Sequence, residues 1–282
     1  MDIDQARTFL AIAAHGSFLA AAEHLHVTQS TVSARIQRLE EELGIRLFVR
    51  NRAGASLTVG GQRFAEYAKR LVLTAEQARQ HVGLPSRYRA TLRIGGRIAL
   101  WDDLLPVWVR WLRSQTEAVA IRSEIGFEED LMRRLIDGTL DIGVMYSPSH
   151  SPGLVVEHLF DETLILVSSR ADDRGPHDDY IYVEWGSAFD IQHAQSYPDI
   201  EPPPQVVNIG WLGVQLMLSN GGSCYLPIRM AKPLIAAGRL YEVSGAPRYQ
   251  HPAYMVYAKD SDNPVVPLAL DGLRHLPQDR AS

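Results

Sequence analysis

Residues 29–35 combine a predicted helix with polar side chains that could contact nucleic acid: Gln29, Ser30, Ser33 and Arg35. A glutamine can bridge N6 and N7 of adenine, a serine hydroxyl can donate or accept, and an arginine can pair with guanine or a phosphate. Thr28 precedes them as a candidate N-cap, and the N-terminus of a helix itself favours anions. These residue types are therefore suited to the base edges and backbone of double-stranded DNA.

The helix that carries these side chains is bounded by clear signals. Its apolar positions recur at intervals of four, three and four: Val32, Ile36, Leu39 and Leu43. One face must therefore be buried, and Gly44 ends the helix. Two helices precede it, one beginning after Asp2 and ending at residues 15–16, and a two-turn helix capped by Ser17. This order is typical of a helix-turn-helix.

A basic hairpin is predicted directly after this helix. Residues 45–58, IRLFVRNRAGASLT, place two short apolar runs around a polar turn. Such a wing would carry Arg50 and Arg52 towards the DNA backbone or the minor groove. The alternative is a three-helix bundle whose polar face is only solvated, and the order of short helix, turn, capped helix and basic hairpin favours DNA binding over it.

Length and charge fit a protein of two parts. The chain of 282 residues has room for about two domains of ~150 residues. Its net charge is -5, yet residues 1–88 hold 11 basic against 8 acidic residues, and residues 89–282 hold 17 against 25. The positive charge that phosphates attract therefore lies in the N-terminal part. A single cysteine, Cys224, precludes an intramolecular disulfide, and no signal peptide or membrane-length apolar run appears, so we expect a cytoplasmic protein without membrane contact.

Residues 61–82 predict a helix that joins the two parts. Its apolar positions step by four and three: Phe64, Ala68, Leu71, Ala75, Ala78 and Val82. This period of 3.5 is that of a two-stranded coiled coil, but three heptads also suit a helix packed inside its own domain. Spacing alone does not decide between them. Residues 83–86, with Pro85, predict a hinge.

From residue 90 onwards, predicted strands and helices alternate. The order strand, helix, strand, helix, strand predicts a mainly parallel, doubly wound sheet, whose ligands bind outside the carboxyl ends of its strands. Residues 158–169 add two more strands, and residues 180–259 repeat the alternation. We therefore expect two similar α/β lobes, joined by crossings near residues 166–168 and 256–259. A helix within residues 264–276 should return to the first lobe.

The N-terminal pattern resembles that of LysR-type transcriptional regulators. The matching segments are Phe9, residues 16–18, 21–22, Leu25, 28–30, 32–33, Ile36, 39–40, 43–44, 47–48, Arg50 and 57–58. The resemblance implies a winged helix-turn-helix in which Gln29, Ser30 and Ser33 face bases and Arg50 and Arg52 lie near the wing. One departure concerns position 34, often arginine in the family but Ala34 here, which puts the usual contact from that position in doubt.

The resemblance extends over nearly the whole chain through the segments LRIG, LLP, DGTLDIGV, YLP and AAGRLYEV. It implies an α+β head at residues 1–60, a linker helix and hinge at 61–88, and an α/β effector-binding domain at 89–282. That domain would have two lobes, as in periplasmic binding proteins, with the first at about 90–166 and 260–282 and the second at about 167–259. The linker would form a homodimer on a pseudo-palindromic operator. Pairing into a homotetramer stays open, and RNA polymerase is a further candidate partner.

A small-molecule effector would sit in the cleft between the lobes. The expected lining residues are Arg97, Ala99, Leu100, Trp101, Phe127, Tyr146, Trp185, Ser187 and His193. The family often holds an inducer carboxylate with a serine or threonine near positions 99 and 100, where this chain has Ala99 and Leu100. An acidic effector held in that way is disfavoured, although Arg97 could supply the charge. Two of these residues also have a purely structural interpretation: Trp185 could belong to the core, and His193 could be a solvated residue on an amphipathic helix.

Catalytic motifs are missing from the sequence. It has no G-x-S-x-G elbow, no phosphate-binding G-x-x-x-x-G-K-[ST] loop, no complete G-x-G-x-x-G fingerprint and no metal-ligand spacing among its histidines. We therefore expect neither an enzyme nor a cofactor or metal. Cys224 suits a small buried strand residue better than a redox sensor. The alternative function is a small-molecule binding protein or enzyme whose N-terminal helices serve only assembly.

Overall fold

The computed structural model describes residues 1–51, 54–82, 85 and 87–275. The chain forms two compact units, Met1–Arg87 and Tyr88–Ser282. No helix within the described ranges is long and apolar enough to cross a membrane. Part of the predicted hinge, residues 83, 84 and 86, lies outside the described residues.

The first unit is a three-helix head with a hairpin and a long helix. Its elements are α1 Ile3–His15, α2 Phe18–His24, α3 Gln29–Leu43, β1 Phe48–Asn51, β2 Gly54–Leu57 and α4 Val59–Val82. The caps explain the boundaries, because Asp2 and Gln5 form a capping box at the start of α1 and Ser17 accepts from the first turn of α2. Gly44 ends α3 in the left-handed conformation, with φ 68°. The predicted helix-turn-helix and antiparallel wing are confirmed.

The core of the first unit is aromatic at its centre. The ring of Phe9 on α1 lies 5.1 Å from Phe48 on β1 and 4.9 Å from Phe64 on α4. Phe64 and Ala68 are buried, so the first part of the predicted heptad series packs inside its own unit. Val82 at the other end is 85% exposed. The series thus passes from two buried positions through the half-buried Leu71 and Ala75 to the exposed Ala78 and Val82, which the spacing alone did not reveal.

The first lobe of the second unit is built on a parallel core. Strand β3 pairs in parallel with β4 on one side and with β5 on the other. The elements are β3 Ala90–Gly96, α5 Ile98–Asp102, α6 Leu104–Gln115, β4 Val119–Ile125, α7 Glu128–Ile136 and β5 Ile142–Met145. This confirms the alternation that the sequence predicted for this part.

The second lobe repeats the alternation with smaller strands. Its elements are β7 Ile181–Val183, α8 Ser187–Ser196, β8 Gln205–Val207, α9 Gly210–Asn220, β9 Ser223–Pro227, α10 Ile228–Ala236 and β10 Tyr241–Glu242. Strands β7 and β8 form a parallel pair, whereas β9 and β10 pair antiparallel with β6.

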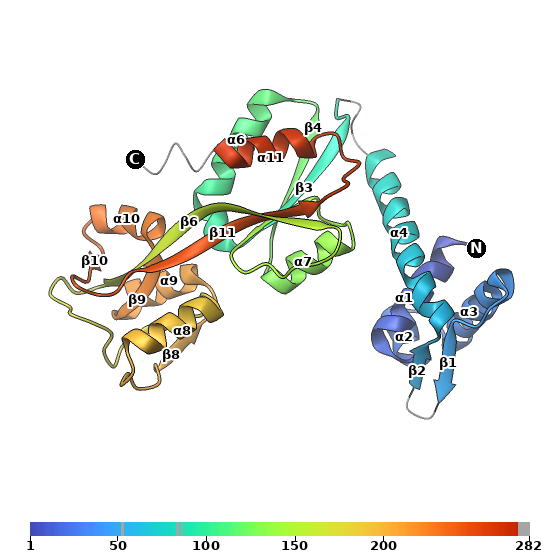
Figure 1. Ribbon diagram of the computed structural model, residues 1–282, viewed down its shortest axis with the longest axis horizontal. Helices are drawn as coiled ribbons and strands as arrows, with labels where there is room; N and C mark the ends of the chain where they lie inside the picture. The colour runs from blue at the N-terminus through green and yellow to red at the C-terminus, as the bar shows by residue number, and fades with distance from the viewer. Residues whose placement is uncertain (52–53, 83–84, 86, 276–282) are drawn as a thin grey trace. The chain divides into compact units, whose positions relative to one another are not determined.

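Two long strands, β6 Leu154–Ser168 and β11 Tyr249–Ala258, run side by side from one lobe to the other (Figure 1). They are antiparallel, with a bulge between Ala253 and Tyr254. The sheet is therefore mixed, in the order β10-β6-β11-β5-β3-β4, and not mainly parallel as the sequence predicted. The expected pair of strands within residues 158–169 is wrong as well, since β6 is one strand, paired with β11 from Leu154 to Leu164 and with β9 from Leu164 to Ser168.

The predicted crossings also differ from the structure. Residues 164–168 of β6 pair with β9 inside the second lobe, and Tyr254–Tyr257 of β11 pair with β5 inside the first. The chain therefore passes between the lobes in the middle of these strands. Helix α11 Val266–His275 returns to the first lobe as predicted and packs on α6, where Trp108 Nε1 donates to the carbonyl of Ala269 at 2.9 Å.

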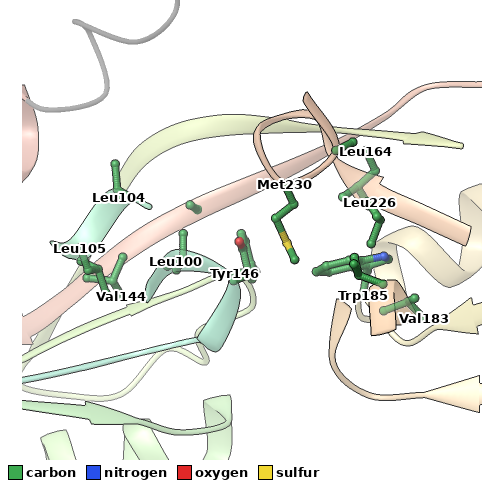
Figure 2. Packing of buried hydrophobic residues seen from close by; sticks show 14 of the residues in the cluster. Leu100, Leu104, Leu105, Val144, Tyr146, Leu164, Val183, Trp185, Leu226 and Met230 are labelled. Atoms are coloured by element: carbon green, nitrogen blue, oxygen red, sulfur yellow. The ribbon is translucent and has the colours of Figure 1, made fainter. Parts of the chain in front are cut away.

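One apolar core runs through both lobes of the second unit. Figure 2 shows Leu100, Leu105 and Val144 of the first lobe on one side, and Leu226 and Val183 of the second lobe on the other. The side chain of Met230 from α10 lies between Tyr146 and Trp185 in this view. The junction of the lobes is therefore a packed region, lined by aromatic and apolar side chains.

Candidate nucleic-acid interface and ligand site

The N-terminus of α3 presents its polar residues to solvent. Thr28 caps the helix, because its Oγ1 accepts from the backbone N–H of Thr31 at 3.2 Å. Gln29 and Ser30 are exposed and Ser33 is half-buried. The apolar residues of the same helix, Val32, Ile36 and Leu39, are fully buried. The structure thus brings the predicted base-reading residues together at the first turns of one helix, with their apolar neighbours fixed in the core.

Arg35 points elsewhere. Its guanidinium donates to Thr8 Oγ1 at 3.3 Å and to Asp4 Oδ2 at 3.4 Å, both on α1. At 100° per residue, position 35 lies well away from positions 29, 30 and 33 around the axis. The side chain therefore braces α3 against α1, and its role in reading bases stays a prediction without structural support.

Glu40 is a residue that sequence analysis missed. Its side chain is only 9% exposed, and its Oε1 accepts from the backbone N–H groups of Leu47 at 2.7 Å and Phe48 at 3.2 Å. Its Oε2 accepts from Arg46 at 3.1 Å. A glutamate on an amphipathic helix is usually solvated, so only the buried backbone amides of the following strand reveal its role. Glu40 ties the end of α3 to the start of the wing.

The wing is held to the rest of the head by its backbone. The N–H of Ala55 donates to the carbonyl of Gly16 at 2.7 Å. Gly54 has φ 131°, and a Cβ there would lie 2.4 Å from that same oxygen, so only glycine fits. Arg50 belongs to β1 opposite Ala55, and the predicted Arg52 lies outside the described residues.

Two predicted ligand residues of the first lobe lie together. The guanidinium of Arg97 is 4.5 Å from the centre of the Phe127 ring, a cation–π distance. Its Nε faces Glu128 Oε1 at 3.4 Å, and its Nη2 donates to the backbone carbonyl of Asn208 in the second lobe at 3.3 Å. Arg97 therefore connects the two lobes and already has polar partners.

The residues after Arg97 belong to the interior. Ala99 and Leu100 are 3% and 0% exposed, and Leu100 points into the core in Figure 2. Trp101 donates from Nε1 to the carbonyl of Glu124 at 2.9 Å. This segment thus offers a ligand no hydroxyl group at positions 99 to 101.

Tyr146 and Trp185 face each other across the junction of the lobes. Their ring centres are 6.5 Å apart in an edge-to-face arrangement. The ring of His251 on β11 stacks on Tyr146 at 4.1 Å and meets Trp185 at 5.6 Å. His251 was not among the predicted residues, because nothing in its surrounding sequence marks it. These three side chains form an aromatic cluster at the centre of the second unit.

An ion-pair network lies beside this cluster. Arg229 on α10 pairs with Glu162 on β6 and, at 2.6 Å, with Asp103 of the first lobe. Its Nη2 also donates to the Tyr146 hydroxyl at 3.2 Å. That hydroxyl donates to Glu162 Oε2 at 2.6 Å, and burial together with the Glu162 charge raises the pKa of Tyr146. Arg229 thus links three elements across the junction.

The two remaining candidates lie apart from each other. Ser187 is exposed at the start of α8. His193 is 4% exposed, stacks on Tyr180 at 5.5 Å and shares a 3.0 Å hydrogen bond with the Tyr180 hydroxyl. Burial lowers the pKa of His193. The imidazole therefore belongs to the aromatic core of the second lobe, and its contact with a ligand remains a prediction.

Comparison with known families identifies both parts of the chain. Residues 3–62 match the family model described as bacterial regulatory helix-turn-helix protein, lysR family, and residues 85–276 match the LysR substrate binding domain. The HTH-type transcriptional regulator HdfR of Yersinia enterocolitica serotype O:8 is 30% identical over 274 residues, which cover 93% of this chain and 92% of HdfR.

Solved structures share the fold. ArgP from Mycobacterium tuberculosis has a TM-score of 0.61 at 22% identity, covering 97% of this chain and 96% of its own. Vibrio fischeri DarR, solved in complex with DNA, has a TM-score of 0.60 at 19% identity, covering 98% and 99%. The chain therefore belongs to the LysR family of DNA-binding transcriptional regulators, whose members bind operator DNA and small-molecule effectors and form oligomers.

Proposed function

We propose that Gln29, Ser30 and Ser33 read base edges in the major groove while the wing contacts the backbone through Arg50 and Arg52. The observation that carries this proposal is that Gln29 and Ser30 are exposed and Ser33 is half-buried at the start of α3, while the apolar residues Val32, Ile36 and Leu39 fix the helix in the core. The capped N-terminus adds the dipole that favours phosphate. Arg35 is left out of the base-reading set because it is engaged with α1.

We further propose that the exposed half of α4 joins two copies into a homodimer on a pseudo-palindromic operator. Support comes from Val82, which is 85% exposed at the end of a heptad series whose first two positions, Phe64 and Ala68, are buried. Two copies related by a twofold axis would present two recognition helices to half-sites one helical turn, or a multiple of it, apart. Ala75→Glu would place a charge in the seam, and sedimentation at micromolar concentration should then detect a larger fraction of monomer.

The effector is proposed to bind at the junction of the lobes, against Arg97, Tyr146 and Trp185. Arg97 and Tyr146 come from the first lobe and Trp185 from the second, and Tyr146 and Trp185 are in ring contact. A ligand there could change how the lobes meet, and that change would alter operator geometry. In this proposal the protein senses the effector without converting it, and it acts in the cytoplasm, where operator DNA lies. The DNA-binding head is residues 1–60, the linker helix and hinge are residues 61–88, and the effector-binding domain is residues 89–282.

A gel-shift series tests the reading residues. The wild-type chain should bind DNA from beside its own gene more tightly than random DNA, with an affinity that falls steeply as salt rises. Gln29→Ala should lose about 1–3 kcal/mol of discrimination at one base position. Arg38→Ala, on the exposed flank of α3, is the matched control and should weaken both DNAs alike. Equal losses on specific and random DNA for Gln29→Ala would contradict the assignment.

A further inference from the structure

One buried polar atom at the junction of the lobes has no partner. Nε2 of His251 is enclosed and makes no hydrogen bond to any described residue. His251 stands on β11 directly opposite Glu162 on β6, and its side chain is 5% exposed. Leaving a buried nitrogen unpaired costs about 1–3 kcal/mol. A buried nitrogen without a partner, on a strand that joins the lobes, points to a bound molecule that supplies the missing hydrogen bond.

The polar groups of the two rings around His251, those of Tyr146 and Trp185, already form hydrogen bonds. The Tyr146 hydroxyl donates to Glu162, and Trp185 Nε1 donates to the carbonyl of Tyr225 at 2.9 Å. The rings of Tyr146 and Trp185 are 4% and 6% exposed, and Met230 lies between them (Figure 2). A molecule in contact with His251 would therefore lie among aromatic and thioether side chains, beside a ring nitrogen without a hydrogen-bond partner.

The arginine side chains at the junction of the lobes already form ion pairs. Arg97 faces Glu128, and Arg229 is paired with both Glu162 and Asp103. His251 itself is uncharged at neutral pH, because burial and the nearby charge of Arg97 lower its pKa to about 4. A carboxylate ligand would compete with Glu128, Glu162 or Asp103 for these arginines, and a carboxylate that it displaced would lose its cation. An uncharged ligand has no such cost.

We propose that His251 determines specificity at the effector site, and that the site selects an effector whose contacting end is uncharged: a hydroxyl, carbonyl or amide on a flat apolar body. The neutral imidazole serves such a group as donor or acceptor, according to its tautomer. Tyr146 and Trp185 receive the flat body edge-on or face-on. This inference rests on the proposed function in one respect, namely that the effector binds at the junction of the lobes.

Two isosteric probes, benzamide and benzoate, test the charge preference. The full-length untagged chain is heated with each probe at pH 7.5 and constant ionic strength, and the unfolding of the second unit is followed by tryptophan fluorescence. Benzamide should raise the unfolding temperature in a saturable way, and its affinity should exceed that of benzoate by at least about tenfold. His251→Phe retains an aromatic ring without the nitrogen and should lose the response to benzamide. His150→Phe, at an exposed histidine, is the matched control and should keep it.

Three results would overturn the proposal: a response to benzoate equal to that to benzamide, no saturable response to benzamide, or an unchanged response in His251→Phe. If His251→Phe does not fold, the imidazole nitrogen resonances of the wild-type chain replace it, and those of His251 must move when benzamide is added. Operator gel-shifts on the same preparation report separately on the proposed function. If the wild-type chain did not bind operator DNA, the proposed function would be contradicted, but its affinity for benzamide would still exceed its affinity for benzoate.

Discussion

Removing the Glu40 carboxylate should uncouple the wing from the recognition helix. The carboxylate accepts two backbone N–H groups at 2.7 and 3.2 Å from a position that is 9% exposed. A hydrogen bond to a charged acceptor contributes about 1.5 kcal/mol at the lower end of its range, so Glu40→Ala should lower the free energy of unfolding of the first unit by about 3 kcal/mol. Glu40→Gln keeps an acceptor oxygen and should lose about half as much. The exposed pair with Arg46 adds little, because that arginine is 83% exposed.

Hydrogen exchange is the appropriate assay for this change. All five tryptophans, at positions 101, 108, 111, 185 and 211, lie in the second unit, so fluorescence does not report on the head. A loss of about 3 kcal/mol should accelerate exchange in peptides covering β1 and β2 on the order of 100-fold. Glu41→Ala, at the exposed neighbouring glutamate, is the control and should change little. Exchange in Glu40→Ala within about threefold of that control would refute the assigned role of the carboxylate.

Three further outcomes follow from the geometry. Arg229→Met leaves the Glu162 carboxylate buried without its cation, and urea unfolding followed by tryptophan fluorescence should detect a loss of about 3–5 kcal/mol; an unchanged midpoint would contradict this. The pKa of His251 near 4 lies below its ordinary value of about 6.5, so the unfolded chain takes up the proton first as pH falls. The second unit should therefore lose about 2 kcal/mol between pH 7 and pH 5, and His251→Phe should flatten that dependence; equal slopes for both chains would exclude the histidine as its source. Gly54→Ala forces a Cβ against the carbonyl of Gly16, and gel-shifts should show weaker DNA binding while circular dichroism retains the helices; wild-type affinity would show that the wing tolerates the strain.

The head could be predicted almost completely because its signals are local. The caps at Asp2, Ser17 and Thr28 and the left-handed Gly44 each act within one turn of the residue that carries them. Apolar spacing then fixes which face of each helix is buried. Glu40 escaped prediction because its partners are backbone amides seven and eight residues later, and main-chain donors leave no trace in residue types.

Predictions for the second unit failed where pairing between distant segments decides the structure. Two strands were expected within residues 158–169, but β11 pairs with Asp161 and Glu162 and keeps β6 continuous. Trp185 and His193 are eight residues apart and were both expected to line the ligand site; the first lies at the junction of the lobes and the second in the core of one lobe, so the ligand contact of His193 stays a prediction. His251 became recognisable only from what surrounds it.

The contact between α11 and α6 has a consequence for how the chain is synthesised. Trp108 is completely buried by a partner residue 161 positions later, and Gly272 lies against the ring of Trp111. The head can fold as soon as it leaves the ribosome, because its unit closes by residue 87. The first lobe cannot close until about residue 275 has emerged, so a nascent chain carries a finished head and an open lobe with two unprotected tryptophans. A chain that stops before α11 would therefore keep all the residues of the head and lack the helix that covers Trp108 and Trp111.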